Sequence, residues 1–238
     1  MSTFWFALAA ALGNMAGAVA VVRSLQRGLR IIDACLAFGA GFMLAVAVLG
    51  VLPEVLREGE GGAIYVLAGY LAVHLAQHVF TSHFHFGEET HRVSRSAGVS
   101  ALLGLTLHTF FDGVAIASGF LVSGELGLLL FLAVLLHKLP EGVTIASVMV
   151  AGGESRQRAL GAAAVLGLAT ILGVVLTELL APLASHGLAI SAGVTIYVAA
   201  SNLVPEFQAK RGWSSALAFF GGAMGFFLTE RLLDLWIR

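Results

Sequence analysis

The sequence predicts an all-α fold, a polytopic membrane protein of eight transmembrane helices. The first observation is composition: 58% of the residues are hydrophobic and only 11% are charged, whereas a soluble domain carries about a quarter charged residues. The second is that apolar residues fall into eight runs of roughly the length that a bilayer requires. The third is a single cysteine, Cys35, which excludes an internal disulfide and a cysteine metal cluster.

The eight predicted spans follow one another through short connections, apart from one longer loop at residues 82–97. We expect a single integral membrane domain over residues 1–238. The predicted spans are Thr3–Val22, Ile31–Leu52, Gly62–Ser82, Gly98–Leu121, Glu125–Met149, Arg158–Pro182, Gly187–Val204 and Trp213–Leu235.

The basic residues predict the orientation, because short cytoplasmic loops carry an excess of lysine and arginine. With both termini outside, nine of the thirteen basic residues fall on the cytoplasmic side: Arg23, Arg27, Arg30, Arg92, Arg95, Arg156, Arg158, Lys210 and Arg211. The long loop, which also holds His83, His85 and His91, is then cytoplasmic.

A Pro-Glu pair follows the second span and another follows the seventh. These pairs are Pro53-Glu54 and Pro205-Glu206, and the predicted topology places them on opposite faces of the membrane. Inverted repeats of this kind occur in secondary transporters, with the substrate site between the halves. The pattern therefore favours a repeat of helices 1–3 and 6–8 around helices 4 and 5, although two Pro-Glu pairs can also arise by chance.

Helices 4 and 5 each place a histidine and a carboxylate four residues apart: His108 with Asp112, and His137 with Glu141. Residues at this spacing lie on one face of a helix. Placing an ionisable residue such as Asp at the centre of a membrane helix costs about 2.5–3.5 kcal/mol of insertion free energy. The short connection at 123–125 makes the two helices antiparallel neighbours, so the two pairs meet at one depth.

Two imidazoles and two carboxylates at one depth favour a divalent metal site. Neutral imidazole binds zinc, iron and related metals, and carboxylates offset the charge of the ion. The alternative is a buried polar network that joins the two helices by hydrogen bonds alone.

These residues also carry a family resemblance. His108-x-x-x-Asp112-Gly and His137-x-x-Pro-Glu141-Gly resemble the core motifs of ZIP (Zrt/Irt-like) divalent metal transporters, most closely the small bacterial members. The stretches 41–45 and 192–198 resemble the second and seventh helices of that family. The resemblance implies that His108, Asp112, His137 and Glu141 form the transport site, and it suggests a homodimer.

From the sequence alone, Met43 is better explained as a packing residue; the resemblance implies that it can instead add a thioether ligand. The family often has a second metal site, and there this chain departs from the pattern. Thr109 stands where asparagine is frequent, and Lys138 stands where many bacterial members place a ligand. A charged lysine cannot ligate a metal, so we expect one transported ion at a time. Lys138 either pairs with Glu141 or occupies the position of the second ion, and Glu178 is a weak candidate for a second-site carboxylate.

Polar residues near the membrane faces suggest a route to and from the site. Glu54 would line the outer entrance, and Glu206, His74 and His78 would lie on the inner exit. The alternative is that these side chains simply face headgroups or a wet cavity. The loop histidines are more typical of a solvated tract that binds metals loosely.

The sequence as a whole predicts inward transport of a divalent transition metal across a bacterial cytoplasmic membrane. Zinc is the expected substrate, with iron, manganese, cadmium and cobalt as alternatives, because ligand type does not fix the choice among these metals. We do not expect an enzyme. Two rival functions are an intramembrane metal-dependent hydrolase, for which no His-Glu-x-x-His motif is present, and a metal sensor that binds without transport.

Overall fold

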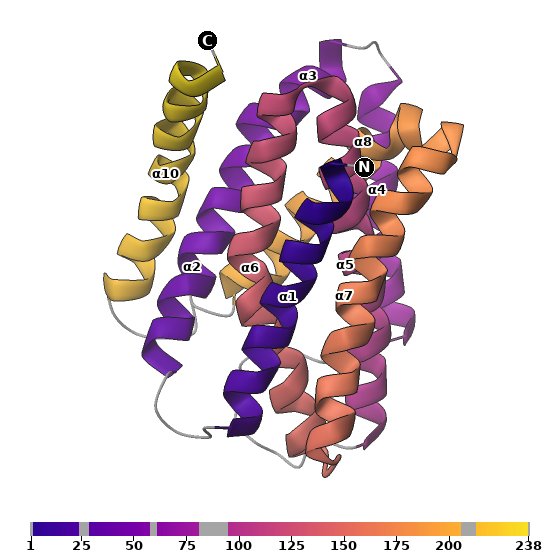
Figure 1. The fold of residues 1–238 in the computed structure, drawn as a ribbon, viewed down its shortest axis with the longest axis vertical. Helices are drawn as coiled ribbons and strands as arrows, with labels where there is room; N and C mark the ends of the chain where they lie inside the picture. Colours follow the sequence, from indigo (N-terminus) through magenta and orange to yellow (C-terminus); the bar gives the residue numbers. More distant parts are fainter. Residues whose placement is uncertain (1, 24–28, 58–60, 81–94, 206–212, 238) are drawn as a thin grey trace.

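The protein is a bundle of long helices. The computed structural model describes residues 2–23, 29–57, 61–80, 95–205 and 213–237, and every element in those ranges is helical (Figure 1). Seven of the described helices are long and apolar enough to cross a membrane, and a shorter apolar stretch, Gly62–Gln77, is the eighth. The predicted all-α class and eight helices are confirmed for these ranges.

Two of the eight helical rods are built from consecutive segments. α2, η1 and α3 follow one another without a break, as do α8 and η2. The start of α1 and the end of α10 lie toward the same end of the bundle in Figure 1. The elements are α1 (Ser2–Arg23), α2 (Leu29–Ala45), η1 (Val46–Val51), α3 (Leu52–Arg57), α4 (Gly62–Phe80), α5 (Arg95–Val122), α6 (Gly124–Ala151), α7 (Arg156–Leu179), α8 (Ala181–Tyr197), η2 (Val198–Leu203) and α10 (Trp213–Ile237).

Four pairs of helices pack with their backbones in direct contact, and a glycine makes this possible at each crossing. A β-carbon on Gly113 would lie 2.0 Å from the carbonyl oxygen of Thr170, a separation that real β-carbons do not adopt. The contact is reciprocal, because a β-carbon on Gly173 would lie 2.1 Å from the carbonyl oxygen of Phe110. In both helices the glycine follows the contacted residue by three positions.

The same reciprocal arrangement recurs at the other three crossings, with hypothetical distances of 1.9 to 2.1 Å. The contacts, each given as glycine and carbonyl residue, are Gly17 with Leu139 and Gly142 with Asn14 between α1 and α6, Gly41 with Phe219 and Gly222 with Phe38 between α2 and α10, and Gly69 with Ile190 and Gly193 with Val66 between α4 and α8.

These crossings divide the bundle into groups. The α1–α6 and α5–α7 pairs also pack against each other, through α1 with α7 and α5 with α6, and so form one four-helix group. The α2–α10 and α4–α8 pairs lie against that group, chiefly through α2 with α6 and α8 with α5. The residues predicted to bind metal all lie on α5 and α6, inside the four-helix group.

A π-helical segment precedes each of the two prolines of the Pro-Glu pairs. η1 ends two residues before Pro53, and η2 ends two residues before Pro205. In each case the residue before the proline donates its backbone N–H to a carbonyl five residues earlier, Leu52 to Ala47 and Val204 to Ala199. A proline has no N–H to donate, and a wide turn next to it accommodates the missing hydrogen bond.

Several predicted boundaries are wrong, among them the start of the seventh span, which lies at Ala181 and not at Gly187. The second span does not end at Leu52, because η1 carries the helix past Pro53 to Arg57. The sixth span does not reach Pro182: α7 ends at Leu179, Leu180 is extended with φ −111° and ψ 111°, and Pro182 lies in the first turn of α8. Proline is favoured there because the first amides of a helix have no intrahelical acceptor.

Candidate metal centre

The two helices that carry the predicted metal ligands form a tight hairpin. α5 ends at Val122 and α6 begins at Gly124, with Ser123 as the cap between them. The Ser123 hydroxyl accepts a hydrogen bond from the backbone N–H of Leu126 at 3.1 Å, which satisfies one of the free amides at the start of α6. This short turn holds the middles of α5 and α6 at one depth.

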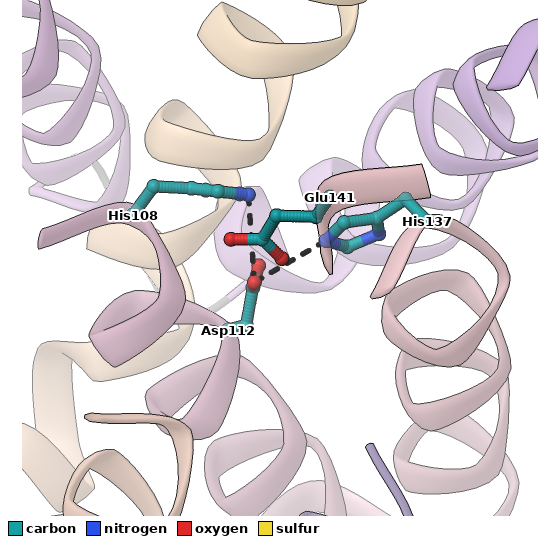
Figure 2. Close-up of side chains that lie close together, drawn as sticks. All are labelled: His108, Asp112, His137 and Glu141. Atoms are coloured by element: carbon teal, nitrogen blue, oxygen red, sulfur yellow. Dashed lines mark hydrogen bonds and ion pairs between the residues drawn. The ribbon is translucent and has the colours of Figure 1, made fainter. Parts of the chain in front are cut away.

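The hairpin brings the four predicted metal ligands together. His108 and Asp112 point from α5, and His137 and Glu141 point from α6, toward one point (Figure 2). One ligand atom from each of the four lies within 4.8 Å of all the others. Each of the four residues is at most 7% exposed, so the group lies in the interior of the bundle.

Asp112 lies at the centre of the group. Its Oδ2 atom is 3.4 Å from Nε2 of His108 and 3.2 Å from Nε2 of His137. Histidine nitrogens and carboxylate oxygens are the usual ligands of zinc and related ions in proteins. Ligand atoms about 2.0–2.2 Å from a tetrahedral metal lie roughly 3.3–3.6 Å from one another, so these two separations are close to those of a bound ion.

The ring of His137 is oriented by its own helix. Its Nδ1 atom lies 2.8 Å from the carbonyl oxygen of Ala133, and because a carbonyl can only accept, Nδ1 is the protonated nitrogen. In the neutral ring, Nε2 then presents its lone pair toward Asp112. Either a proton on Nε2, which makes the 3.2 Å hydrogen bond to Oδ2 of Asp112, or a cation bound between the two atoms satisfies this arrangement. Metal-binding histidines are typically oriented in this way by a hydrogen bond from the other nitrogen.

Lys138 supplies a cation beside this group. Its Nζ atom donates to Oδ2 of Asp112 at 2.6 Å and to Oε2 of Glu141 at 2.7 Å, and its side chain is completely buried. The sequence left two interpretations of Lys138, a pair with Glu141 or a cation in the position of the second ion. The contacts agree with both, because the ammonium pairs with Glu141 and also lies against Asp112. The ammonium group bridges the two carboxylates and offsets their charges.

Two atoms of the four-residue group have no hydrogen-bond partner, Nδ1 of His108 and Oε1 of Glu141. Elsewhere in the described bundle, Oγ of Ser118 and both side-chain polar atoms of Asn14 are also buried and unpaired. Leaving a buried polar group without a partner costs about 1–3 kcal/mol. Of the two unpaired atoms in the group, Oε1 of Glu141 belongs to a ligand carboxylate, whereas the nitrogen of His108 that faces Asp112 is its other one, Nε2.

Asn14 is a polar residue that the sequence interpretation missed. It lies on α1, is completely buried, and its backbone contacts Gly142, the neighbour of Glu141. The signal was available, since Asn14 is an amide near the middle of an apolar run. A single amide in such a run gives no spacing pattern to pair it with the ligands.

The remaining predicted residues near the group lie outside the four-residue cluster. Met43 is buried in the apolar core that also contains Ala133. Thr109 is buried, but its hydroxyl donates to the carbonyl of Thr106 on its own helix at 3.0 Å.

The predicted acidic residues near the membrane faces have partners of their own. Glu178 is exposed near the end of α7, where the hydroxyl of Thr3 donates to it. Glu54 is half-buried and pairs with Arg57 at 3.3 Å. Glu206 lies outside the described residues, as do the loop histidines His83, His85 and His91.

The two histidines predicted for the exit route lie on α4. The ring of His74 packs edge-on against Tyr197 of α8, with centroids 5.7 Å apart. His78 belongs to the same helix, and its side chain lies outside the described part of the structure. The ring contact places His74 next to the start of η2, and His74 is not one of the four clustered residues.

Comparison with known proteins agrees with this geometry. Residues 85–232 match the model of a protein family described as ZIP zinc transporter. The match covers more than half of the chain and includes all four clustered residues. No curated protein matches the chain. The chain belongs to the ZIP zinc transporter family.

Proposed function

We propose that this protein carries a divalent transition metal, zinc before others, inward across the bacterial cytoplasmic membrane. Family membership establishes metal transport across a membrane as its activity and sets aside the intramembrane hydrolase. The observation that carries the proposal further is the buried cluster, in which His108, Asp112, His137 and Glu141 offer ligand atoms within 4.8 Å of one another.

In the proposed cycle, an ion enters from the outer side near Glu54 and exchanges hydration water for the four clustered ligands. Met43 adds a thioether if it turns toward the ion. Release follows toward His74, His78 and Glu206 on the cytoplasmic side. Because the ligands bind a metal only in their deprotonated forms, proton release accompanies binding and proton uptake accompanies release.

The reciprocal glycine crossings suggest which helices move together. Two helices whose backbones touch at two points cannot slide past each other without driving a side chain into a carbonyl group. We therefore propose that α1, α5, α6 and α7 move as one body that carries the ion. The paired helices α2–α10 and α4–α8 form the frame against which that body moves.

The predicted inverted repeat is supported by the packing. The repeat would exchange α1 with α7, α2 with α8, α4 with α10 and α5 with α6. Under this exchange the α1–α6 crossing corresponds to the α5–α7 crossing, and the α2–α10 crossing corresponds to the α4–α8 crossing. The same exchange turns η1 into η2, each ending two residues before a proline. With such a repeat the cluster lies between the halves, where transporters of this design bind substrate.

The proposal includes one ion at a time, both termini outside and a possible homodimer. The single-ion element follows from Lys138, whose buried ammonium adds a positive charge beside the two carboxylates and so repels a second dication. The outside termini rest on the basic residues, and the dimer rests on the family resemblance.

Metal-resolved uptake tests the proposal. Purified protein in liposomes is supplied with zinc, iron, manganese, cadmium and cobalt singly and in competition, and accumulated metal is measured by mass spectrometry. We expect saturable zinc uptake that His137→Ala abolishes. Binding without accumulation would support a sensor instead, and uptake that is indifferent to His137→Ala would remove the cluster from the transport path.

A further inference from the structure

Lys138 occupies the position that a metal ion needs. Its Nζ atom is 2.6 Å from the same Oδ2 atom of Asp112 toward which both histidines turn. A zinc ion bound to that oxygen would lie at about 2.0–2.2 Å from it. An ammonium and a dication on the same buried oxygen repel each other, so binding of the ion favours movement of the ammonium.

The place to which the ammonium moves is restricted. The side chain of Lys138 is completely buried, so a displaced ammonium must find an acceptor inside the bundle. The base of the side chain lies against α1, because a β-carbon on Gly13 would lie 3.1 Å from the β-carbon of Lys138. A displaced ammonium therefore stays close to the α1–α6 interface.

Among the described residues, Oδ1 of Asn14 is the unpaired acceptor on that interface. Asn14 adjoins Gly13 on α1, and its backbone contacts Gly142, one helical turn after Lys138 on the same face of α6. Both polar atoms of its side chain are buried and without partners. The unpaired hydroxyl of Ser118 lies on α5 against Gly187 of α8, and Oε1 of Glu141 belongs to the metal ligands.

We propose that Asn14 is a positioning residue for metal binding: when the ion enters, the ammonium of Lys138 leaves the carboxylates and donates to Oδ1 of Asn14. The inference deepens the proposed function and rests on it. It explains why an amide with no partner lies beside the metal group, since its partner arrives only when the ion binds. It also makes Lys138 a tethered cation that alternates with the transported one.

Equilibrium zinc affinity in detergent tests this inference without requiring transport. Affinity is measured by competition with a chromophoric chelator for wild type, Asn14→Leu, Lys138→Met and the double variant. Leucine keeps the size of asparagine and removes its polar atoms. We expect Asn14→Leu to weaken zinc binding about tenfold, because a hydrogen bond to a charged group is lost in the bound state only.

The double variant separates positioning from packing. In the Lys138→Met background there is no ammonium to hold, so Asn14→Leu should leave zinc affinity unchanged within about twofold. A residue that merely packs would weaken binding equally in both backgrounds, and that result would overturn the inference. Ser118→Ala is the matched control, since it removes another buried unpaired polar atom and should not change affinity.

A structure of the wild-type protein with cadmium bound gives a second test that needs no variant. We expect Nζ of Lys138 within hydrogen-bond distance of Oδ1 of Asn14. An ammonium that stays between Asp112 and Glu141 beside the ion, or that turns elsewhere, would refute the inference. If wild type binds zinc and His137→Ala binds it equally, the proposed function fails as well; if only Asn14→Leu is without effect, the metal site stands and this inference alone falls.

Discussion

Gly113 and Thr170 meet where α5 crosses α7, and the space between them is closed: a β-carbon on Gly113 would lie 2.0 Å from the carbonyl oxygen of Thr170. Gly113 directly follows Asp112, so this crossing fixes the height and rotation of α5 next to a metal ligand. Distances within the cluster therefore depend on a contact that contains no ligand.

Replacing Gly113 by alanine should separate α5 from α7 and destabilise the protein. Overpacking of an interior costs about 1–3 kcal/mol, and here the obstacle is backbone that cannot rotate away. We expect a clear fall in melting temperature and weaker zinc binding, both measured in detergent. Gly161→Ala on α7 is the control, because nothing lies within 4 Å of its hypothetical β-carbon; a fall as large in Gly161→Ala would contradict the role of the crossing.

Removing a clustered histidine should abolish metal binding while leaving the fold in place. Loss of an outer-shell partner already costs about 10–100-fold in metal affinity, so His137→Ala should lose at least that much. Calorimetric titration with zinc measures the loss. Thr144→Val is the matched variant on α6, because the hydroxyl of Thr144 bonds only to the carbonyl of Pro140, and it should bind zinc like wild type.

Lys138→Met should destabilise the metal-free protein, because it leaves two buried carboxylates without their cation. Breaking a buried ion pair by removing one partner costs about 3–5 kcal/mol. Zinc supplies the missing charge, so we expect it to raise the melting temperature of the variant by more than that of wild type. Thermal unfolding with and without zinc measures both effects, and a variant as stable as wild type in chelator would show that the bridge contributes nothing.

Glu178→Gln should leave zinc uptake unchanged. The residue is exposed and bonded to Thr3, and surface substitutions usually change free energies by no more than about 0.5 kcal/mol, which corresponds to roughly twofold in a binding constant. Uptake into liposomes at matched protein content measures the effect. A loss comparable to that of Glu141→Gln would instead make Glu178 part of the transport path.

The cluster could be predicted because its geometry is mostly local. Spacing of four residues places His108 over Asp112 and His137 over Glu141, and the short turn at Ser123 sets the relative depth of the two helices. The rotation of each helix about its own axis then decides whether the four side chains face one another. That rotation follows from the fact that all four are ionisable and avoid lipid.

Contacts that depend on how helices cross could not be predicted in the same way. The sequence placed Lys138 beside Glu141, one turn away, but its bond to Asp112 depends on the relative rotation of α5 and α6. The contact of Asn14 with Gly142 depends on the crossing of α1 and α6, which no local pattern encodes. Pro182 was assigned to the wrong helix because a proline marks a helix start and a helix end equally well.

The hydrogen bond from His137 to the carbonyl of Ala133 joins two residues of one helix, one turn apart. The direction of the imidazole is thus a property of α6 itself and does not require any neighbouring element to stay in place. If α5 and α6 shift together relative to the α2–α10 and α4–α8 pairs, the imidazole of His137 keeps its orientation toward Asp112. In the proposed movement of the four-helix group, this internal hydrogen bond would let the imidazole keep its orientation toward the ion while the surroundings of α6 change.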